Sequence, residues 1–281
     1  AGNYPRTTSE IELAGLSLDA KQVERTAEAL GIEIGQDEYV TVQSAPPCAP
    51  TMYLGLDGTG VPMRPTAVEG RAGKQPDGSA KTREVKLAVV WSAESKNAEG
   101  QPQRDPGSVS YSAAIESAAD DDTARGLSVV AQRAMREAER RGFTRASRQV
   151  VIGDGAPWIW NIAGELFPDA IQIVDRYHVK EHLAKVAKSV FGPESSLVKG
   201  WQDERFQELD EGRLVELMSV LNSHAKKNDD ARKCRDYIER NKDRMRYAQF
   251  KAMGLCTSSG VVEAGCKVVV GTRLKRAGMR W

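Results

Sequence analysis

At residues 148–175 the chain reads RQVVIGDGAPWIWNIAGELFPDAIQIVD. The apolar run at 148–155 is typical of a buried strand, and it closes with an Asp-Gly pair. Residues 157–167 begin with a proline, which fits the first turn of a helix, and a second short apolar run follows at 170–175. We therefore predict a strand, a helix and a second strand in this order.

Three β-rich segments precede this stretch: MYLGLDGTG (52–60), REVKLAVVWSAES (83–95) and SVSYSAAI (108–115). A Gly- and Lys-rich loop at 65–82 separates the first two, and the three segments predict an antiparallel meander. Residues 120–141 begin with acidic and end with basic side chains, as a helix favours. The order β-β-β-α-β-α-β is that of an RNase H-like fold, an α/β class with helices on both faces of a mixed sheet.

Helical spacing marks the N-terminal end of the chain. Residues 10–31 carry apolar side chains at helical spacing, with a break that resembles the turn between two short helices. We therefore predict a helix-turn-helix-like remnant over 1–45. The consecutive prolines within 43–51 fit neither a helix interior nor a central strand, so they indicate a linker and a domain boundary near residue 50.

The remaining chain divides into three parts. The first part of the RNase H-like core is expected over 50–176, an all-helical insertion over 177–255, and the final helix of the core with a basic tail over 256–281. The chain begins with Ala1 rather than Met and stops at Trp281 directly after a basic stretch. We therefore expect a fragment or a decayed reading frame whose last segment is truncated.

Composition narrows the class of protein. The 281 residues are 40% hydrophobic, which predicts a globular chain, and no apolar run approaches the roughly 18 residues that a membrane span needs. With no leader-like segment either, we expect a cytoplasmic protein without a membrane partner. The four cysteines are widely spaced and form no C-x-x-C pair, so neither a disulfide framework nor a cysteine zinc site is indicated.

Charge is unevenly distributed along the chain, although the net charge is only +1. Residues 1–175 carry 18 Lys and Arg against 25 Asp and Glu, whereas residues 176–281 carry 22 against 14. The basic half is where a polyanion is expected to bind. The alternative is a solvated helical surface that is merely rich in Lys and Arg.

Three acidic residues form the main candidate site. Asp57 and Asp154 each end a predicted strand and precede a glycine, which permits a sharp turn and leaves room for a substrate. Glu263 lies in SSGVVEAGCKVVVGTRLKR (258–276), where the Ser pair and Gly suit a helix start. In the predicted fold the two strand ends lie side by side. Such carboxylates can hold two Mg²⁺ ions about 3.5–4 Å apart for phosphoryl transfer.

Each acidic residue also has an ordinary structural explanation. Asp-Gly is among the commonest turn pairs, and a Glu near a helix start is usually solvated. The order of the elements favours a joint site. The two Asp-Gly pairs close the first and the fourth predicted strands, which are neighbours in the predicted fold, and Glu263 follows a helical insertion.

Four blocks carry a family resemblance: YLGLDGTGVPM, VVIGDGAPWIWNIA, IVDRYHVKEHL and SSGVVEAGCKVVVGTRLKRAGMRW. They resemble the DDE transposases of bacterial insertion sequences of the ISKra family, from about residue 50 to the end of the chain. The resemblance implies that Asp57, Asp154 and Glu263 are a catalytic triad holding two Mg²⁺ (or Mn²⁺) ions. It implies cleavage at the element ends and attack of the freed 3′-hydroxyl on target DNA.

The same resemblance implies the partners. These are the terminal repeats of the element, target DNA and further copies of the chain in a homo-oligomer on DNA, at the bacterial nucleoid. Four basic residues are placed to hold phosphates beside the Glu263 helix: Arg273, Lys275, Arg276 and Arg280. They can equally complement a helix dipole. An inactive or domesticated transposase fragment that only binds DNA is the alternative function.

A histidine motif allows a rival function. His178 and His182 lie four residues apart in H-x-x-E-H, the pattern of an inverted zincin, in which two histidines bind Zn²⁺ and a Glu activates water. Within a transposase, Asp175 and His178 can instead sit near the metal site and position DNA or the attacking group. His178 can also simply pack against the sheet. A kinase or ATPase would need a second Gly-rich phosphate loop, which the sequence does not indicate.

Overall fold

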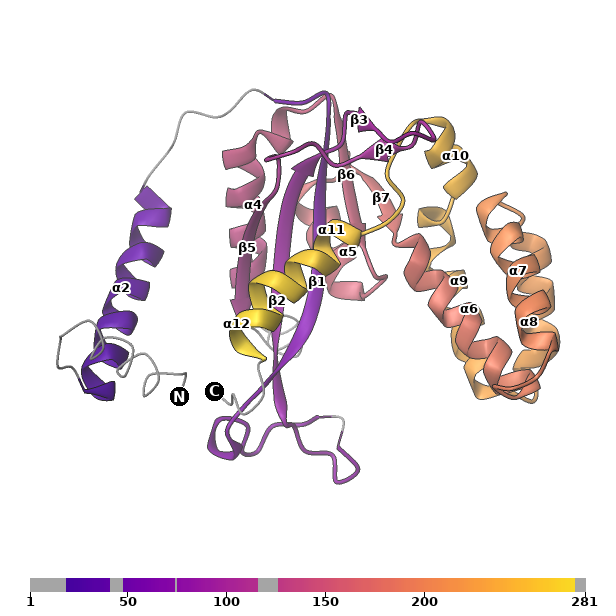
Figure 1. Ribbon diagram of the computed structural model, residues 1–281, viewed down its shortest axis with the longest axis horizontal. Helices are drawn as coiled ribbons and strands as arrows, with labels where there is room; N and C mark the ends of the chain where they lie inside the picture. Colours follow the sequence, from indigo (N-terminus) through magenta and orange to yellow (C-terminus); the bar gives the residue numbers. More distant parts are fainter. Residues whose placement is uncertain (1–18, 41–47, 74, 116–125, 276–281) are drawn as a thin grey trace.

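The computed structural model describes residues 19–40, 48–73, 75–115 and 126–275 (Figure 1). Its centre is a five-stranded mixed sheet with the strand order β5-β2-β1-β6-β7. The antiparallel half contains β1 (Thr51–Pro62), β2 (Thr82–Ser92) and β5 (Ser110–Ile115). The parallel half adds β6 (Arg148–Gly153) and β7 (Ile171–Val174) to β1. The predicted strands and their order are confirmed.

Two small features next to β1 and β2 were not predicted. A hairpin of β3 (Ser95–Lys96) and β4 (Pro102–Gln103) follows β2, and a short 3₁₀ helix, η1 (Pro65–Ala67), lies in the predicted loop after β1. The hairpin turns at Gly100, which has a φ of 73° that favours glycine. Neither feature has enough alternating apolar residues to give a strand or helix signal.

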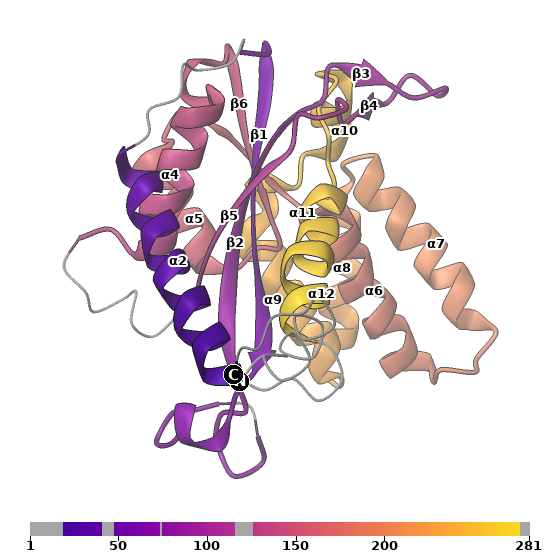
Figure 2. The ribbon, with the colours of Figure 1, turned by 60° about the vertical axis from the view of Figure 1, so that its left-hand side comes forward.

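Helices cover both faces of the sheet. Two helices, α4 (Val129–Arg141) and α5 (Pro157–Leu166), pack on one face, and α11 (Gly260–Gly265) crosses the other. Figure 2 shows α4 and α11 on opposite sides of the strands. After α11 the chain continues as a π-helix, η4 (Cys266–Gly271), and as α12 (Thr272–Leu274). The coarse prediction of a mixed α/β fold with helices on both faces is confirmed.

The helix predicted over 120–141 begins later than expected. Residues 116–125 lie outside the described residues, and the described helix α4 starts only at Val129. Ser128 is the cap, and its hydroxyl accepts the Ala131 amide at 3.2 Å. A side-chain cap of this kind satisfies a free amide of the first turn, so it fixes the start more firmly than acidic side chains further upstream.

The region predicted as a helical insertion consists of helices in the described chain. They stand together beyond the β7 edge of the sheet (Figure 1). They are α6 (Arg176–Phe191), α7 (Leu197–Asp210), α8 (Leu214–Ala225), α9 (Asp229–Asn241), the 3₁₀ helix η3 (Lys242–Arg244) and α10 (Tyr247–Ala252). A further 3₁₀ turn, η2 (Phe143–Arg145), links α4 to β6.

The N-terminal segment is described only in part. Helix α2 (Ala20–Val40) is continuous over 21 residues, and Asp19 accepts the Lys21 and Gln22 amides at its start. Residues 1–18, which include the first half of the predicted helix-turn-helix, lie outside the described residues, as do the linker residues 41–47. No helix in the described part of the chain is long and apolar enough to cross a membrane.

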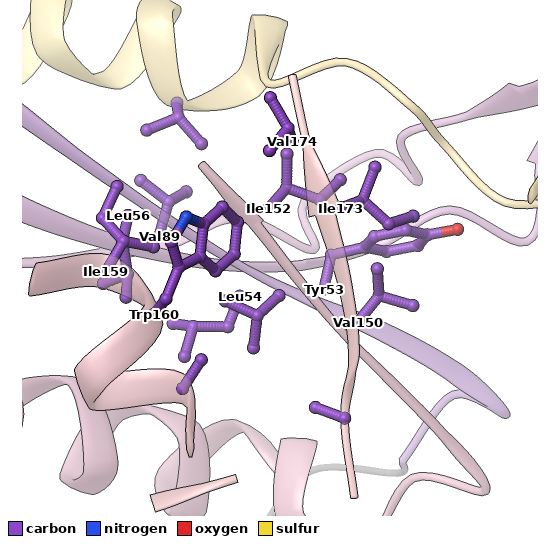
Figure 3. Packing of buried hydrophobic residues seen from close by; sticks show 14 of the residues in the cluster. Tyr53, Leu54, Leu56, Val89, Val150, Ile152, Ile159, Trp160, Ile173 and Val174 are labelled. Carbon is purple, nitrogen blue, oxygen red and sulfur yellow. The ribbon is translucent and has the colours of Figure 1, made fainter. Parts of the chain in front are cut away.

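The main core fills the layer between the parallel strands and α5. Leu54 and Leu56 are fully buried there, beside Ile159 and Trp160 of α5, whereas Val150 and Ile152 are buried on the other face of the sheet with Tyr53 (Figure 3). Each fully buried aliphatic side chain contributes about 1.5–3 kcal/mol relative to exposure. This core holds the ends of β1 and β6 in fixed register, which places the residues that follow them.

Candidate metal centre

Asp57 and Asp154 occupy neighbouring positions on adjacent parallel strands. The last registered pair between β1 and β6 is Leu56 with Gly153, and each aspartate is the residue that directly follows in the sequence. Both side chains are partly buried. Burial raises the pKa of the Asp57 carboxyl, and the nearby Asp154 charge raises it further. The fold therefore brings together the first two residues of the candidate site.

Asp57 does not end its strand, contrary to the prediction. β1 continues to Pro62 because β2 pairs with it along its whole length, from Met52 to Pro62. Only the pairing with β6 stops at Leu56, since β6 ends at Gly153. Pairing with β2 provides backbone hydrogen bonds for Asp57 and Gly58, the residues that an Asp-Gly pair would otherwise indicate to be a turn.

The glycines after the aspartates do not leave open room for a substrate in this structure. Gly58 lies within β1, and a β-carbon there would approach the Glu84 carboxylate oxygen to 2.5 Å. Gly155 does turn the chain, with a φ of 95° that strongly favours glycine, but a β-carbon there would approach the Tyr237 ring to 2.6 Å. Protein side chains, rather than open space, therefore lie over both glycines.

Glu263 lies on α11, which packs closely on β1. An added β-carbon at Gly55 would overlap Val262 of α11 and come within 2.9 Å of the Trp91 ring. Only glycine allows this approach of the helix to the strand, two residues before Asp57. Glu263 is largely exposed, but partial burial of its carboxyl raises the pKa, and the negative charges of Asp175, Glu181 and Asp57 raise it further.

The negative charges of the three carboxylates influence one another, but the carboxylates do not form a set of metal ligands in this structure. Among the described residues, no group of three His, Cys, Asp or Glu side chains is close enough to hold a metal ion. The Glu263 carboxylate also has no hydrogen bond or ion pair with any described residue. The structure therefore places two carboxylates side by side and the third across from them on a helix.

Hydrogen bonds fix the orientation of both aspartates. Asp57 accepts the Gly58 amide at 2.7 Å through Oδ1 and the Cys266 thiol at 3.2 Å through Oδ2. Asp154 accepts the Ala156 amide at 2.9 Å through Oδ1. Cys266 was not among the predicted site residues, although it lies three residues after Glu263 and so on the same side of the helix.

Asp175 has a structural role, because its carboxylate is buried and hydrogen-bonded within the protein. It is 1% exposed, and its Oδ1 accepts the Tyr177 and His178 amides at 2.6 and 3.1 Å, which caps α6. Its Oδ2 accepts both the amide and the hydroxyl of Ser259, the residue before α11. Asp175 therefore ties the end of β7 to the helix that carries Glu263.

His178 and His182 face each other on α6. Their Nε2 atoms are 3.3 Å apart, and His178 Nδ1 lies 3.6 Å from the Glu181 carboxylate. His182 stacks on Tyr237, with ring centroids 4.5 Å apart. Burial and the neighbouring His178 lower the pKa of His182. Zinc sites need at least three protein ligands, and the described residues offer no third one here.

The basic residues of the C-terminal segment are described in part. Lys275 donates to the hydroxyl of Thr59, two residues after Asp57 on β1. The exposed Arg273 donates to the Val268 carbonyl at 3.1 Å, within its own helical segment. Arg276 and Arg280 lie outside the described residues. Of the four basic residues predicted to hold phosphates, Lys275 thus lies next to the strand that carries Asp57.

No protein-family model and no curated protein matches the chain. The solved structures similar to the chain include two of NurA. The crystal structure of NurA is 11% identical with a TM-score of 0.14, over 92% of this chain and 47% of that one. NurA bound to dAMP and manganese is 13% identical with a TM-score of 0.14, over 91% and 47%. The chain thus spans about half the length of these structures, and similarity at this level assigns neither fold nor function.

Proposed function

We propose that the chain is a DNA transposase of the DDE type, in which Asp57, Asp154 and Glu263 hold two Mg²⁺ or Mn²⁺ ions. One observation carries the proposal. Asp57 and Asp154 follow the last registered pair of two parallel strands, and the Glu263 helix packs on the same strand at Gly55. The strand order, with three antiparallel strands and then two parallel ones, supports the finer assignment to an RNase H-like fold.

The chemistry of the three residues fits a divalent cation. Burial and neighbouring negative charge raise the pKa of both Asp57 and Glu263. Like-charged carboxylates at one place disfavour ionisation unless a cation lies between them. Hard carboxylate oxygens are the ligands that Mg²⁺ and Mn²⁺ prefer. Because the three are not at ligand distance in this structure, the proposal requires Glu263 to approach the aspartates when the ions bind.

The mechanism assigns a part to each residue. When bound, the metal ions activate water for phosphodiester cleavage and stabilise the charge on the phosphate. Asp57 and Asp154 would hold the ions from the sheet, and Glu263 would complete the ligand set from α11. Cys266 orients Asp57 by its hydrogen bond to Oδ2. Lys275, beside Thr59, offers positive charge to a DNA phosphate without reading its sequence.

The rest of the assignment follows from this function. The substrates would be the terminal repeats of the element and target DNA, and the protein would act as a homo-oligomer at the bacterial nucleoid in the cytoplasm. Residues 50–176 and 256–281 would form the catalytic core, with 177–255 as the helical insertion and 1–45 as a DNA-binding helix-turn-helix remnant. A DNA-binding protein without cleavage activity is the alternative that the following experiment distinguishes.

The test is nicking of supercoiled plasmid DNA with Mn²⁺ or Mg²⁺. We expect activity from the wild type, and losses of at least about 10²-fold in Asp57→Asn and Asp154→Asn. Asp169→Asn is the control, because Asp169 is exposed on the loop before β7. DNA binding without nicking by the wild type would establish the alternative function, and nicking that survives both changes would refute the proposed triad.

A further inference from the structure

Tyr237 of α9 reaches across to the strand end that carries Asp154. Its hydroxyl donates a hydrogen bond of 2.7 Å to the main-chain carbonyl of Asp154. The two residues are 83 positions apart in sequence, and Tyr237 is only 9% exposed. A side chain of the helical region therefore contacts the backbone of a residue proposed to bind metal.

The turn after Asp154 is built around this tyrosine. Gly155 has a φ of 95°, and a β-carbon there would lie 2.6 Å from Tyr237 Cε2 and 2.8 Å from its hydroxyl. From the other side, His182 stacks on the ring at an interplanar angle of 30°. The ring is therefore held between α6 and the turn, and its hydroxyl has one fixed direction.

The carbonyl and the carboxylate of Asp154 are mechanically linked. Asp154 Oδ1 accepts the amide of Ala156, two residues further on, so the side chain is part of the same turn whose carbonyl Tyr237 holds. A rotation of the Asp154 peptide would carry the carboxylate with it. The contact at the carbonyl thereby restricts where the free Oδ2 can point.

We infer that Tyr237 is a positioning residue for Asp154, through which the helices beyond β7 control the geometry of the metal centre. This inference rests on the proposed function in so far as Asp154 is a metal ligand. Tyr237 acts through the Asp154 backbone and is not itself proposed as a metal ligand. Its effect is to hold the Asp154 backbone so that the carboxylate faces Asp57.

A matched pair of tyrosines allows a sharp test. Tyr237→Phe removes one hydroxyl and keeps the ring between His182 and the turn. Tyr247→Phe is the control, because the Tyr247 hydroxyl donates at 2.9 Å to the Val174 carbonyl, at the end of the neighbouring strand β7. Each variant loses one buried hydrogen bond to a strand-end carbonyl, so both should lower the melting temperature by a similar amount.

Two measurements are made on both variants: hydrogen exchange and calorimetric titration with Mn²⁺. In Tyr237→Phe we expect faster exchange of the Ala156 amide and a Mn²⁺ affinity lowered by about 5- to 10-fold, the effect of one lost hydrogen bond. In Tyr247→Phe neither should change. Unchanged exchange at Ala156, or faster exchange with unaltered Mn²⁺ affinity, would overturn the inference.

Failure of the proposed function would give a different result. If the wild type binds no Mn²⁺, the metal centre is refuted, while exchange at Ala156 still shows whether Tyr237 holds the Asp154 turn. Tyr247→Phe could also lose as much Mn²⁺ affinity as Tyr237→Phe. That result would mean that general loosening of the strand ends, and not the positioning of Asp154, determines the affinity, and it would overturn the inference.

Discussion

Replacing Gly55 by alanine should disable the candidate site without touching a charged residue. Gly55 lies on β1 under α11, and the added methyl group would come within 2.9 Å of the Trp91 ring and still closer to Val262. Carbon atoms in contact are about 3.5 Å apart or more, so the overlap with Val262 exceeds about 0.6 Å. Val262 is β-branched and fully buried, and its side chain has little freedom to rotate away. The helix must therefore move.

The size of the effect follows from this displacement. Overpacking of a buried site costs about 1–3 kcal/mol, which lowers the melting temperature by several degrees in a protein of this size. A misplacement of about 1 Å can cost about 10²-fold in rate. Because α11 carries Glu263, we expect Gly55→Ala to lose at least about 10-fold in Mn²⁺-dependent DNA nicking.

Two variants serve as controls for Gly55→Ala. Gly200→Ala adds a methyl group to an exposed position in α7 where nothing lies within 4 Å, so it should stabilise by about 0.5–1 kcal/mol and leave nicking unchanged. Adding Val262→Ala to Gly55→Ala removes the overlapping methyl group and should restore part of the activity. A Gly55→Ala protein that is destabilised but nicks DNA at the wild-type rate would refute the role of α11.

Further predictions concern the charged residues around the site. The pKa of Asp57 is raised in the folded state, so metal-free wild-type protein should lose stability relative to Asp57→Asn as the pH rises through that pKa. Added Mn²⁺ should reverse the difference. Melting temperatures that follow the pH in parallel for the two proteins would contradict this prediction. Asp175→Asn places an amide group against the hydrogen-bond donors of Ser259 or of the first turn of α6. It should lower the free energy of unfolding, measured in urea titrations, by about 2–4 kcal/mol. Almost no loss of stability would show that these hydrogen bonds are dispensable. Lys275→Ala should weaken binding to any DNA sequence and reduce the slope of log affinity against log salt by about 1, whereas an unchanged slope would exclude a phosphate contact.

Local sequence signals predicted most of the fold. The apolar run before Asp154, the proline at the start of α5 and the short run before Asp175 each specify their element within a few residues, because buried strands and capped helices depend on neighbouring side chains. The continuation of β1 beyond Asp57 was not predictable in this way. It depends on pairing with β2, and an Asp-Gly pair looks the same in a turn and in a paired strand.

The candidate site was predicted in its residue types but not in its contacts. Cys266 bonds to Asp57 across 209 positions of sequence, and Tyr237 bonds to Asp154 across 83. Neither a lone cysteine nor a tyrosine within a helix has a periodic signature. Asp175 was placed near the site from its spacing to His178, but its bonds to Ser259 depend on where α11 docks. Such long-range partners are set by tertiary packing.

The most direct test of the account is calorimetric titration of the purified protein with Mn²⁺, with Asp57→Asn and Asp154→Asn beside the wild type. We expect that the wild type binds Mn²⁺ and that either substitution abolishes binding, while His178→Ala retains it. A protein that binds no Mn²⁺ but binds Zn²⁺ tightly, with binding lost only in His178→Ala, would contradict the acidic metal centre and favour a zinc hydrolase.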